Sequence, residues 1–278
     1  MPVIAMTREM GTRGKDVALG VANRLGLDVV HHEIVEKSVA ERLRMSESSV
    51  HRFLEGQASL WERWQVDHQR LSRYTAVEIL ELAARGNVVI RGWGAAQLLA
   101  PVAHVVRVRV CASMQGRVAE MTRRLDLDDE EVARAEIVRS DKAHDRIIRS
   151  RFNSDWQDST GYALTLNTGA LPIETCVNYV CALADNAACS ETSESHAKLD
   201  NILIAERVRA AIDDDTEFGT VAGDVTIKSD RGHVTLKCMV TSGTDIEGLV
   251  ERVKEVPGVK SVQNDIRTMP LVYGTYGP

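Results

Sequence analysis

Short apolar runs alternate with helix-like segments over the first two thirds of the chain. The runs have the length and composition of buried strands, whereas apolar residues between them recur at three- and four-residue steps. Strands are predicted at residues 3–6, 27–31, 87–90, 102–110 and 162–166. Helices are predicted at residues 17–25, 31–44, 46–85, 95–99, 114–125, 132–151 and 173–184. This alternation predicts an α/β fold with a parallel sheet covered by helices, whose active site would lie where the strands end.

The predicted helical region at residues 46–85 carries a stripe of mostly large side chains at helical spacing. Its members are Trp61, Trp64, His68, Leu71, Tyr74, Val77, Leu80 and Ala84. Such a stripe is typical of a packed core or a subunit interface rather than of a cofactor site. We therefore expect packing, with a homo-oligomer as one form of it.

The last third of the chain follows a different pattern. Residues 188–198 are polar and rich in small side chains, which is typical of a linker. A helix, a hairpin that turns at residues 230–232, a second helix and a last strand at residues 262–266 follow. This order predicts a small α+β unit of the αββαβ type. We expect domains at residues 1–187 and 199–268, a linker at 188–198 and a C-terminal tail at 269–278.

The length of 278 residues exceeds that of one average domain, in keeping with two domains. No apolar run reaches the ~20 residues of a membrane-spanning helix, and the strand predicted at residues 3–6 leaves no room for a signal peptide. These features predict a cytoplasmic protein. Five scattered cysteines without a CxxC pair are expected to be reduced core residues.

The net charge of −6 is unevenly distributed along the chain. Residues 188–278 hold 10 Lys/Arg and 15 Asp/Glu, a difference of −5. Residues 1–187 hold the other 24 and 25, a difference of −1. Because neither part is basic, the charge argues against nucleic-acid binding. It also argues against electrostatic attachment of the C-terminal part to anionic lipid.

The glycine-rich turn after the first strand is the strongest candidate for chemistry. Gly11 and Gly14 lie between a buried strand and a helix start, where backbone amides converge and the helix dipole favours an anion. Lys15 would add a positive charge. Gly14 and Lys15 fit the P-loop pattern G-x-x-x-x-G-K-[ST], but Glu9 and Asp16 replace its first glycine and its hydroxyl residue. On this stretch alone, a phosphate-binding turn and an ordinary strand–turn–helix both fit.

Other predicted strands also end in polar residues. His31 and His32 follow the second strand, Arg91 follows the third, and Asn167 and Thr168 follow the fifth. Because parallel strands end at one edge of a sheet, these residues are candidates for substrate contact. A metal site at the histidine pair is disfavoured, since sequence neighbours face different ways and no third ligand follows at a metal-like spacing. A solvated loop pair stays open as the alternative there.

The helix predicted to end near residue 151 carries a stripe of cations. Arg139, Lys142, Arg146 and Arg149 are three, four and three residues apart, so they share one helical face. Such a stripe is usually a solvated surface. Beside a phosphate-binding turn, cations could instead neutralise the charge that develops during phosphoryl transfer.

Residues 3–186 resemble the cytidylate kinase-like family, which is related to the nucleoside monophosphate kinases among P-loop proteins. The resemblance rests on residues 7–15 and 33–37 near the start, and on 106–110, 139–142, 152–156 and 164–168 later in the chain. It implies a P-loop kinase fold that binds ATP and Mg²⁺.

The resemblance also implies roles for individual residues. The nucleotide phosphates would lie on Gly11, Thr12, Arg13, Gly14 and Lys15, with the Asp16 carboxylate at the metal. Catalysis would depend on Lys15 and on a lid formed by Arg139, Lys142 and Arg146. A nucleotide or another small phosphate acceptor would meet His31, His32, Arg91 and Arg109.

Two departures from the family pattern concern the acceptor. His31 and His32 stand where the family usually has Asp-Arg, and Trp93 stands where it usually has an arginine. The leading hypothesis is an ATP-dependent phosphotransferase of the cytidylate or nucleoside monophosphate kinase type. The departures keep a second hypothesis open, a catalytically inactive nucleotide-binding regulator.

Residues 199–268 resemble a BON domain, on the stretches 230–236 and 256–262. BON domains are regarded as binding or assembly modules, so no catalytic residues carry over. The resemblance implies a protein or phospholipid partner. The acidic charge and the absence of an export signal favour a cytoplasmic regulatory or assembly role.

Overall fold

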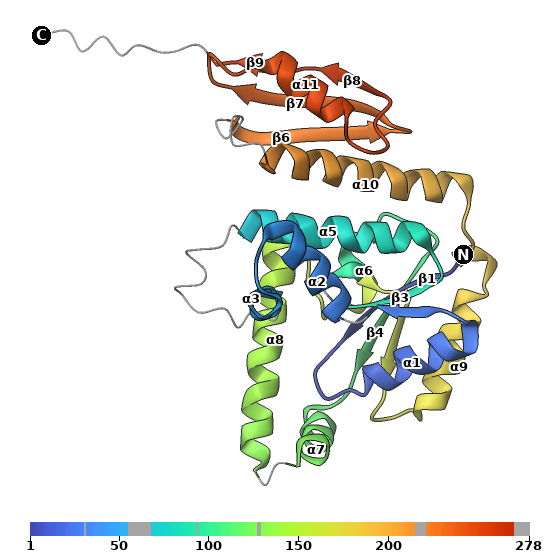
Figure 1. Ribbon diagram of the computed structural model, residues 1–278. Helices are drawn as coiled ribbons and strands as arrows, with labels where there is room; N and C mark the ends of the chain where they lie inside the picture. Colours follow the sequence, from blue (N-terminus) through green and yellow to red (C-terminus); the bar gives the residue numbers. More distant parts are fainter. Residues whose placement is uncertain (31, 55–67, 93, 127–128, 215–220, 270–278) are drawn as a thin grey trace, which may run out of the picture. The chain divides into compact units, whose positions relative to one another are not determined.

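The computed structural model describes residues 1–278 apart from residues 31, 55–67, 93, 127–128, 215–220 and 270–278 (Figure 1). The side chains of residues 32–34, 53–54, 68 and 221–224 lie outside the description as well. The chain divides into two compact units, Met1–His196 and Ala197–Pro278.

A five-stranded sheet forms the centre of the first unit. Its strands run in the order β2-β3-β1-β4-β5, and every neighbouring pair is parallel. The central strand β1 therefore lies between β3 and β4. The bounds are β1 (Val3–Arg8), β2 (Asp28–Val30), β3 (Val88–Arg91), β4 (Val105–Cys111) and β5 (Leu164–Asn167). The predicted α/β fold with a parallel sheet is confirmed.

Helices cover both faces of this sheet (Figure 1). α1 and α9 pack together on one face, where their apolar side chains join Ile4, Met6 and Val108 in one buried cluster. α5 and α6 cover the opposite face and contact β3 and β1. The bounds are α1 (Gly14–Leu25), α2 (His32–Leu43), α3 (Glu47–Leu54), α5 (His68–Arg85), α6 (Ala95–Leu98), α7 (Met114–Leu125), α8 (Glu130–Phe152) and α9 (Ile173–Ala184). A short 3-10 turn, Ser159–Gly161, precedes β5.

Local signals explain where several helices start and stop. Gly26 closes α1 in the left-handed conformation, at φ 64°, and its amide bonds a carbonyl of the last turn. The side chains of Ser113 and Asp129 accept hydrogen bonds from amides in the first turns of α7 and α8. The helices predicted at residues 114–125 and 173–184 have the observed bounds of α7 and α9.

The region predicted to be helical at residues 46–85 contains α3 and α5. The part with Trp61 and Trp64 lies outside the described residues, as does the side chain of His68. Later members of the stripe, among them Leu71, Tyr74 and Leu80, are buried. α5 contacts α2 and β3, so the described part of the stripe packs inside the first unit.

The stretch expected to be a linker is partly helical. A 3-10 turn (Ala187–Cys189) is followed by helix α10 (Ser193–Asp214). The Thr192 hydroxyl accepts from the Ser195 amide at 3.1 Å, and the Ser195 hydroxyl accepts from the Thr192 amide at 2.9 Å. This reciprocal pair is a capping box, with serine in place of the usual Glu or Gln. Ser195 Oγ also lies 2.8 Å from the buried His104 Nδ1, which ties the start of α10 to the first unit.

The second unit contains a small mixed sheet with helices α10 and α11 (Ile246–Lys254). β7 (His233–Val240) pairs antiparallel with β6 (Val221–Asp230) and parallel with β8 (Ser261–Asn264) and β9 (Arg267–Thr268). Alternate residues of β7, including Val234 and Leu236, join apolar side chains of both helices in one buried cluster. The predicted α+β unit is confirmed, with β9 added after its last predicted strand.

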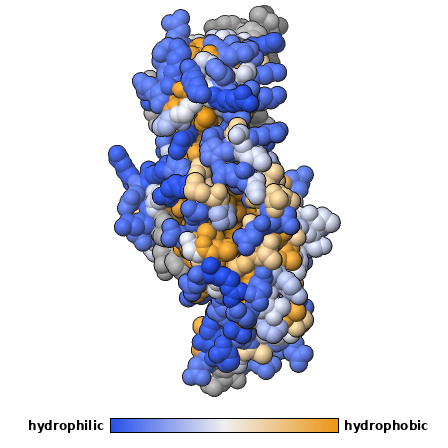
Figure 2. All heavy atoms as spheres, turned by 90° about the vertical axis from the view of Figure 1, so that its right-hand side faces the viewer, coloured by the Kyte–Doolittle hydropathy of each residue, from blue (hydrophilic) through white to orange (hydrophobic). Residues whose placement is uncertain are grey.

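Figure 2 shows orange, hydrophobic side chains gathered at mid-height on the face that it presents, and mostly blue ones at its lower end. The lower end holds α7 and the start of α8 (Figure 1).

Within the part of the chain that the structure describes, no helix is both long enough and apolar enough to cross a membrane.

Candidate phosphate-binding site

Residues 9–15, named here the glycine loop, join the end of β1 to the start of α1. Because β1 is the middle strand, this loop lies between the ends of β3 and β4. Gly11 has φ +81° and Arg13 has φ +57°, and these left-handed residues turn the chain from the strand into the helix. Helix α1 then begins at Gly14. The geometry is that of a strand–loop–helix junction at the carboxyl edge of a parallel sheet.

Several backbone amides of the glycine loop have no acceptor within the described part of the chain. They are the amides of Met10, Gly11, Arg13, Gly14 and Lys15. The Glu9 amide bonds the Val110 carbonyl at 3.1 Å, and the Thr12 amide bonds the Glu9 carbonyl at 3.3 Å. Unpaired amides at a helix N-terminus are donors for an anion.

Three carbonyl groups of the glycine loop, in contrast, are held by side chains. The Glu9 carbonyl accepts a hydrogen bond from the Thr12 hydroxyl at 2.7 Å. The Met10 carbonyl accepts one from Arg117 Nε at 2.7 Å, and the Thr12 carbonyl accepts one from the Thr168 hydroxyl at 2.6 Å. The loop thus presents free donors and engaged acceptors, which suits a negatively charged ligand.

Three charged side chains lie at the start of α1. Lys15 is exposed and makes no hydrogen bond or ion pair with other described residues. The Asp16 carboxylate accepts a hydrogen bond from Arg13 Nε at 2.9 Å. Both partners of this pair are about half exposed, so the pair is weak and the carboxylate remains accessible.

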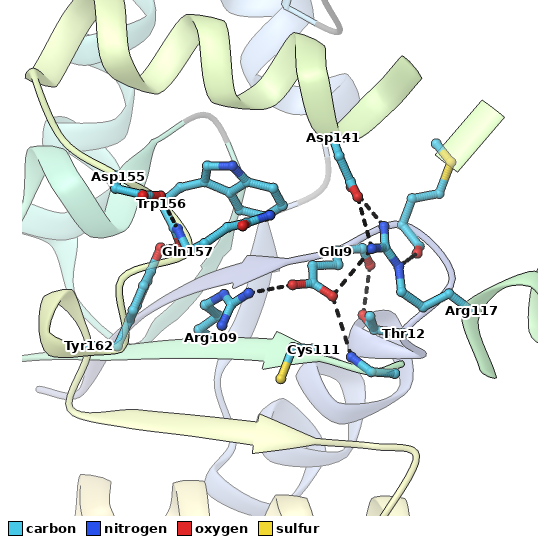
Figure 3. A network of polar contacts seen from close by, with 12 residues as sticks. Glu9, Thr12, Arg109, Cys111, Arg117, Asp141, Asp155, Trp156, Gln157 and Tyr162 are labelled. Carbon is cyan, nitrogen blue, oxygen red and sulfur yellow. Dashed lines mark hydrogen bonds and ion pairs between the residues drawn. The ribbon is translucent and has the colours of Figure 1, made fainter. Parts of the chain in front are cut away.

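Glu9, which replaces the first glycine of the P-loop pattern, is a buried charge (Figure 3). Its carboxylate accepts hydrogen bonds from Arg109 and from the Ala112 amide, the latter at 3.4 Å. Arg117 Nη1 lies 3.5 Å from Oε2, the oxygen that accepts from the Ala112 amide, whereas Arg109 bonds Oε1. A buried carboxylate without partners would cost several kcal/mol, so two arginines and an amide explain why Glu9 is tolerated at this position.

Arg117 connects this charge to helix α8 (Figure 3). Its two terminal nitrogens donate to the two Asp141 oxygens at 2.8 and 2.7 Å, a bidentate arrangement. Its third donor, Nε, bonds the Met10 carbonyl. Arg117 is only 4% exposed, so its guanidinium belongs to the interior of the site.

The two loop glycines allow close packing from opposite sides. A Cβ on Gly11 would lie 2.6 Å from the Arg117 carbonyl oxygen. A Cβ on Gly14 would lie 2.8 Å from the Cβ of Arg8. Any larger residue would push the loop away from α7 or from the end of β1.

An aromatic wall flanks the glycine loop on the side of α8. Trp156 is buried; its ring lies 4.5 Å from that of His144 and 5.9 Å from the guanidinium carbon of Arg109. The Tyr162 hydroxyl donates to the Trp156 carbonyl at 2.7 Å. Burial, with the charge of Arg8 next, lowers the pKa of His144 to about 4, so this imidazole is neutral at pH 7.

Three nitrogens along this wall are buried without a hydrogen-bond partner among the described residues. They are Trp156 Nε1, His144 Nε2 and Arg109 Nε. Buried polar atoms are normally paired, with protein, water or ligand atoms. The wall therefore holds two nitrogen donors, on Trp156 and Arg109, and an imidazole nitrogen of His144 that donates or accepts according to its tautomer.

The predicted substrate residues are only partly described. Arg91 ends β3 and is buried, opposite Met6 in the register of β1. Arg109 lies on β4 and contacts Glu9. His31 and Trp93 lie outside the described residues, as does the side chain of His32.

The predicted cationic stripe lies on the exposed side of α8. Arg139, Lys142, Arg146 and Arg149 are all exposed, whereas Ala133, Ile137 and Ile148 on the other side of the helix are buried. Asp141, not the stripe, faces the glycine loop through Arg117. Arg139 bonds Glu136, and Arg149 bonds Asp145 and Asp155. The structure does not bring the stripe together with the glycine loop.

Three residues that line the glycine loop in the structure were not predicted as site residues from the sequence: Glu9, Arg117 and Asp141. Glu9 was visible as a departure from the P-loop pattern, and only a buried counter-charge makes such a departure tolerable. Arg117 and Asp141 are each one of several charged residues on an amphipathic helix. Nothing in their spacing indicates that they meet each other and the loop.

No group of three or more His, Cys, Asp or Glu side chains suited to a metal ion occurs among the described residues. The five cysteines are free. Cys111, beside the site at the end of β4, is half-buried, and burial raises the pKa of its thiol. Cys176, Cys181 and Cys238 are buried, as expected for core residues, whereas Cys111 and Cys189 are only partly buried.

Comparison with sequence families finds two matches. The profile of the cytidylate kinase-like family matches residues 3–170, and that of the BON domain matches residues 202–270. No curated protein matches the sequence.

Solved structures show a similar fold. An uncharacterized protein from Eubacterium ventriosum ATCC 27560 is 18% identical, with a TM-score of 0.54; the match covers 66% of this chain and 98% of that one. This likeness supports the fold alone.

Two kinases match at lower scores. A shikimate kinase from Bacteroides thetaiotaomicron is 15% identical over 66% of this chain and 99% of its own, with a TM-score of 0.42. A sugar kinase from Janibacter sp. HTCC2649 is 15% identical over 69% and 99%, with a TM-score of 0.43.

Proposed function

The chain belongs to the cytidylate kinase-like family, and from this membership we propose that it is an ATP-dependent phosphotransferase with an appended BON binding module. The observation that carries the proposal is the set of loop amides at the N-terminus of α1 that find no acceptor among the described residues, beside Lys15, which has no partner among them either. Such a junction is suited to the phosphates of a nucleotide.

The glycine loop fits the phosphates of ATP because the amides of Gly11, Arg13, Gly14 and Lys15 are not used by any other described residue. The Lys15 side chain adds an exposed positive charge at the same helix end. Asp16 is the residue we assign to Mg²⁺, since its carboxylate is accessible and a hydrated Mg²⁺ needs only one or two protein carboxylates. Bound MgATP would supply the phosphoryl group and metal charge neutralisation.

In this proposal the chain contributes positioning and charge rather than covalent chemistry. We assign the acceptor side to Arg91 at the end of β3 and to the partly buried Arg109 on β4. His31 and His32, whose side chains lie outside the described residues, stay predictions for the same role. The neutral His144 and the indole of Trp156 supply uncharged hydrogen-bonding groups nearby. We propose a nucleoside monophosphate-type molecule, or another small anionic metabolite, as the acceptor.

The cationic stripe, Arg139, Lys142 and Arg146, stays a prediction for the loaded enzyme. Its exposed position means that any contact with phosphate requires a rearrangement of α8. The BON unit is proposed to bind a protein or phospholipid partner. A homo-oligomer and a cytoplasmic location remain part of the same proposal.

The test is nucleotide binding and turnover by the full chain. Calorimetry with MgADP is followed by ATP turnover against a panel of nucleoside monophosphates. Lys15→Ala should weaken MgADP binding by roughly tenfold or more, as expected for a lost charge-assisted contact. Lys37→Ala, at an exposed lysine of α2, is the matched control and should bind like the wild type.

The outcomes separate the two functional hypotheses. Turnover with any acceptor supports the phosphotransferase. Binding without turnover would leave the nucleotide-binding regulator. Neither binding nor turnover by the wild-type chain would refute both.

A further inference from the structure

Helices α7 and α8 hold the glycine loop at three points. The Arg117 carbonyl oxygen would lie 2.6 Å from a Cβ on Gly11, so the backbones are in direct contact there. Arg117 Nε bonds the Met10 carbonyl. The Met10 side chain packs against a buried cluster of α7 and α8 that includes Val118, Met121 and Ile137. These contacts connect the loop to elements more than a hundred residues away in sequence.

The geometry of the peptide bond makes the contact with the Met10 carbonyl informative. In a trans peptide the C=O of one residue and the N–H of the next point in opposite directions. Every peptide bond in the described part of the chain, the glycine loop included, is trans. Because Arg117 holds the Met10 carbonyl on the side of α7, the Gly11 amide points away from α7.

The same argument applies one peptide further along. The Thr168 hydroxyl, at the end of β5, holds the Thr12 carbonyl at 2.6 Å. The Arg13 amide must therefore point away from Thr168. Both amides that are turned in this way, Gly11 and Arg13, belong to the set that has no acceptor among the described residues.

Arg117 itself has little freedom to do anything else. Its Nε and both terminal nitrogens are used by the Met10 carbonyl and by Asp141, and its side chain is 5% exposed. The bidentate contact with Asp141 fixes the plane of the guanidinium. Reaching a bound phosphate would require breaking all of these contacts.

We propose that Arg117 and Thr168 are positioning residues that aim the amides of the glycine loop by holding its carbonyls from behind. This inference rests on the proposed nucleotide site and deepens it. Neither side chain needs to touch the nucleotide. Asp141 contributes indirectly, because its carboxylate orients the guanidinium of Arg117.

The decisive variants are Thr168→Val and Arg117→Lys. Valine keeps the shape of threonine but cannot donate to the Thr12 carbonyl. Lysine keeps the charge but lacks the planar guanidinium whose nitrogens donate to the Met10 carbonyl and to Asp141 at the same time. The controls are Thr165→Val, at an exposed threonine of β5, and Arg123→Lys, at an exposed arginine of α7 that pairs with Glu120.

Two measurements on the full chain distinguish positioning from direct contact. Hydrogen exchange of the Glu9 and Thr12 amides, which are hydrogen-bonded to the Val110 and Glu9 carbonyls, is measured without nucleotide, and MgADP affinity is measured by calorimetry. Each decisive variant should raise exchange at these amides and weaken MgADP binding by roughly tenfold, the effect of one lost buried hydrogen bond. Both controls should match the wild type in exchange and affinity.

Weaker binding with unchanged exchange would overturn the proposal, because the side chains would then touch the nucleotide instead of the loop. Unchanged affinity in both variants would overturn it as well. If Arg117→Lys fails to fold, Thr168→Val decides alone. If the wild type binds no nucleotide, the proposed function fails, while the exchange data still show whether the two residues hold the loop.

Discussion

Replacing Gly11 by alanine tests whether the glycine loop and α7 are in the contact that the structure shows. Two costs are expected. The first is the left-handed conformation at φ +81°, which disfavours any residue with a Cβ. The second is the clash of the new Cβ with the Arg117 carbonyl oxygen at 2.6 Å, a backbone atom that cannot rotate away.

Gly26→Ala is a matched control that isolates the first cost. Gly26 also has a positive φ, +64°, but nothing lies within 4 Å of its Cβ position. The left-handed penalty of about 1–2 kcal/mol is partly offset by the smaller entropy of the unfolded chain, so Gly26→Ala should lose about 0.5–1 kcal/mol. Overpacking adds about 1–3 kcal/mol, so Gly11→Ala should lose about 1.5–4 kcal/mol.

The assay is urea unfolding of both variants, followed by calorimetry with MgADP. Gly11→Ala should bind MgADP at least tenfold more weakly, since relief of the clash moves the loop amides. Gly26→Ala should bind like the wild type. If the two variants lose the same stability, the close approach of Arg117 to Gly11 is absent and the reasoning fails.

Three further predictions concern other parts of the molecule. Because the pKa of His144 falls from 6.5 to about 4 on folding, acid protonates the unfolded chain first, and stability drops by about 2 kcal/mol between pH 8 and pH 5. The difference in unfolding free energy between the wild type and His144→Leu should shrink by this amount, and a constant difference would contradict the burial of a neutral imidazole. Joint replacement of Arg139, Lys142 and Arg146 by alanine should change stability by less than about 0.5 kcal/mol per site, since all three are exposed. The same variant should keep MgADP affinity and lose turnover at least tenfold if the stripe acts only in the transition state; unchanged turnover would reject the lid. Leu236→Ala, in the core of the second unit, should destabilise that unit by about 2–5 kcal/mol. Proteolysis of residues 197–278 should then accelerate while MgADP binding stays unchanged, and a joint loss of both would show that the units do not act separately.

Local patterns in the sequence were enough to predict most of the fold. The apolar runs and helical periods predicted the parallel sheet and the αββαβ order of the second unit. In the structure, Ser113 caps the start of α7 and Gly26 caps the end of α1. The glycine-rich turn was also recognisable, because a strand, two glycines, a lysine and a helix start are all local features.

Local sequence patterns could not predict which face of α8 is buried. Helical periodicity placed Arg139, Lys142 and Arg146 on one face, but it contained no information about what that face meets. Packing of Ala133, Ile137 and Ile148 turned the opposite side inward, and with it Asp141. The direction in which a stripe faces depends on the apolar residues that the whole fold must bury.

The charge balance and the hydrogen bonds of the glycine loop likewise depend on residues that are distant in the sequence. Glu9 looked like a defect in a P-loop pattern, yet Arg109 and Arg117 neutralise it from positions about a hundred residues further along the chain. Thr168 and Arg117 hold the carbonyls of the loop from two other elements. The sequence alone determined which elements form and where a phosphate could bind, since those depend on neighbours in the chain. Only the tertiary structure decided which charges meet, because electrostatic and hydrogen-bonded contacts act across space between elements that local patterns cannot connect.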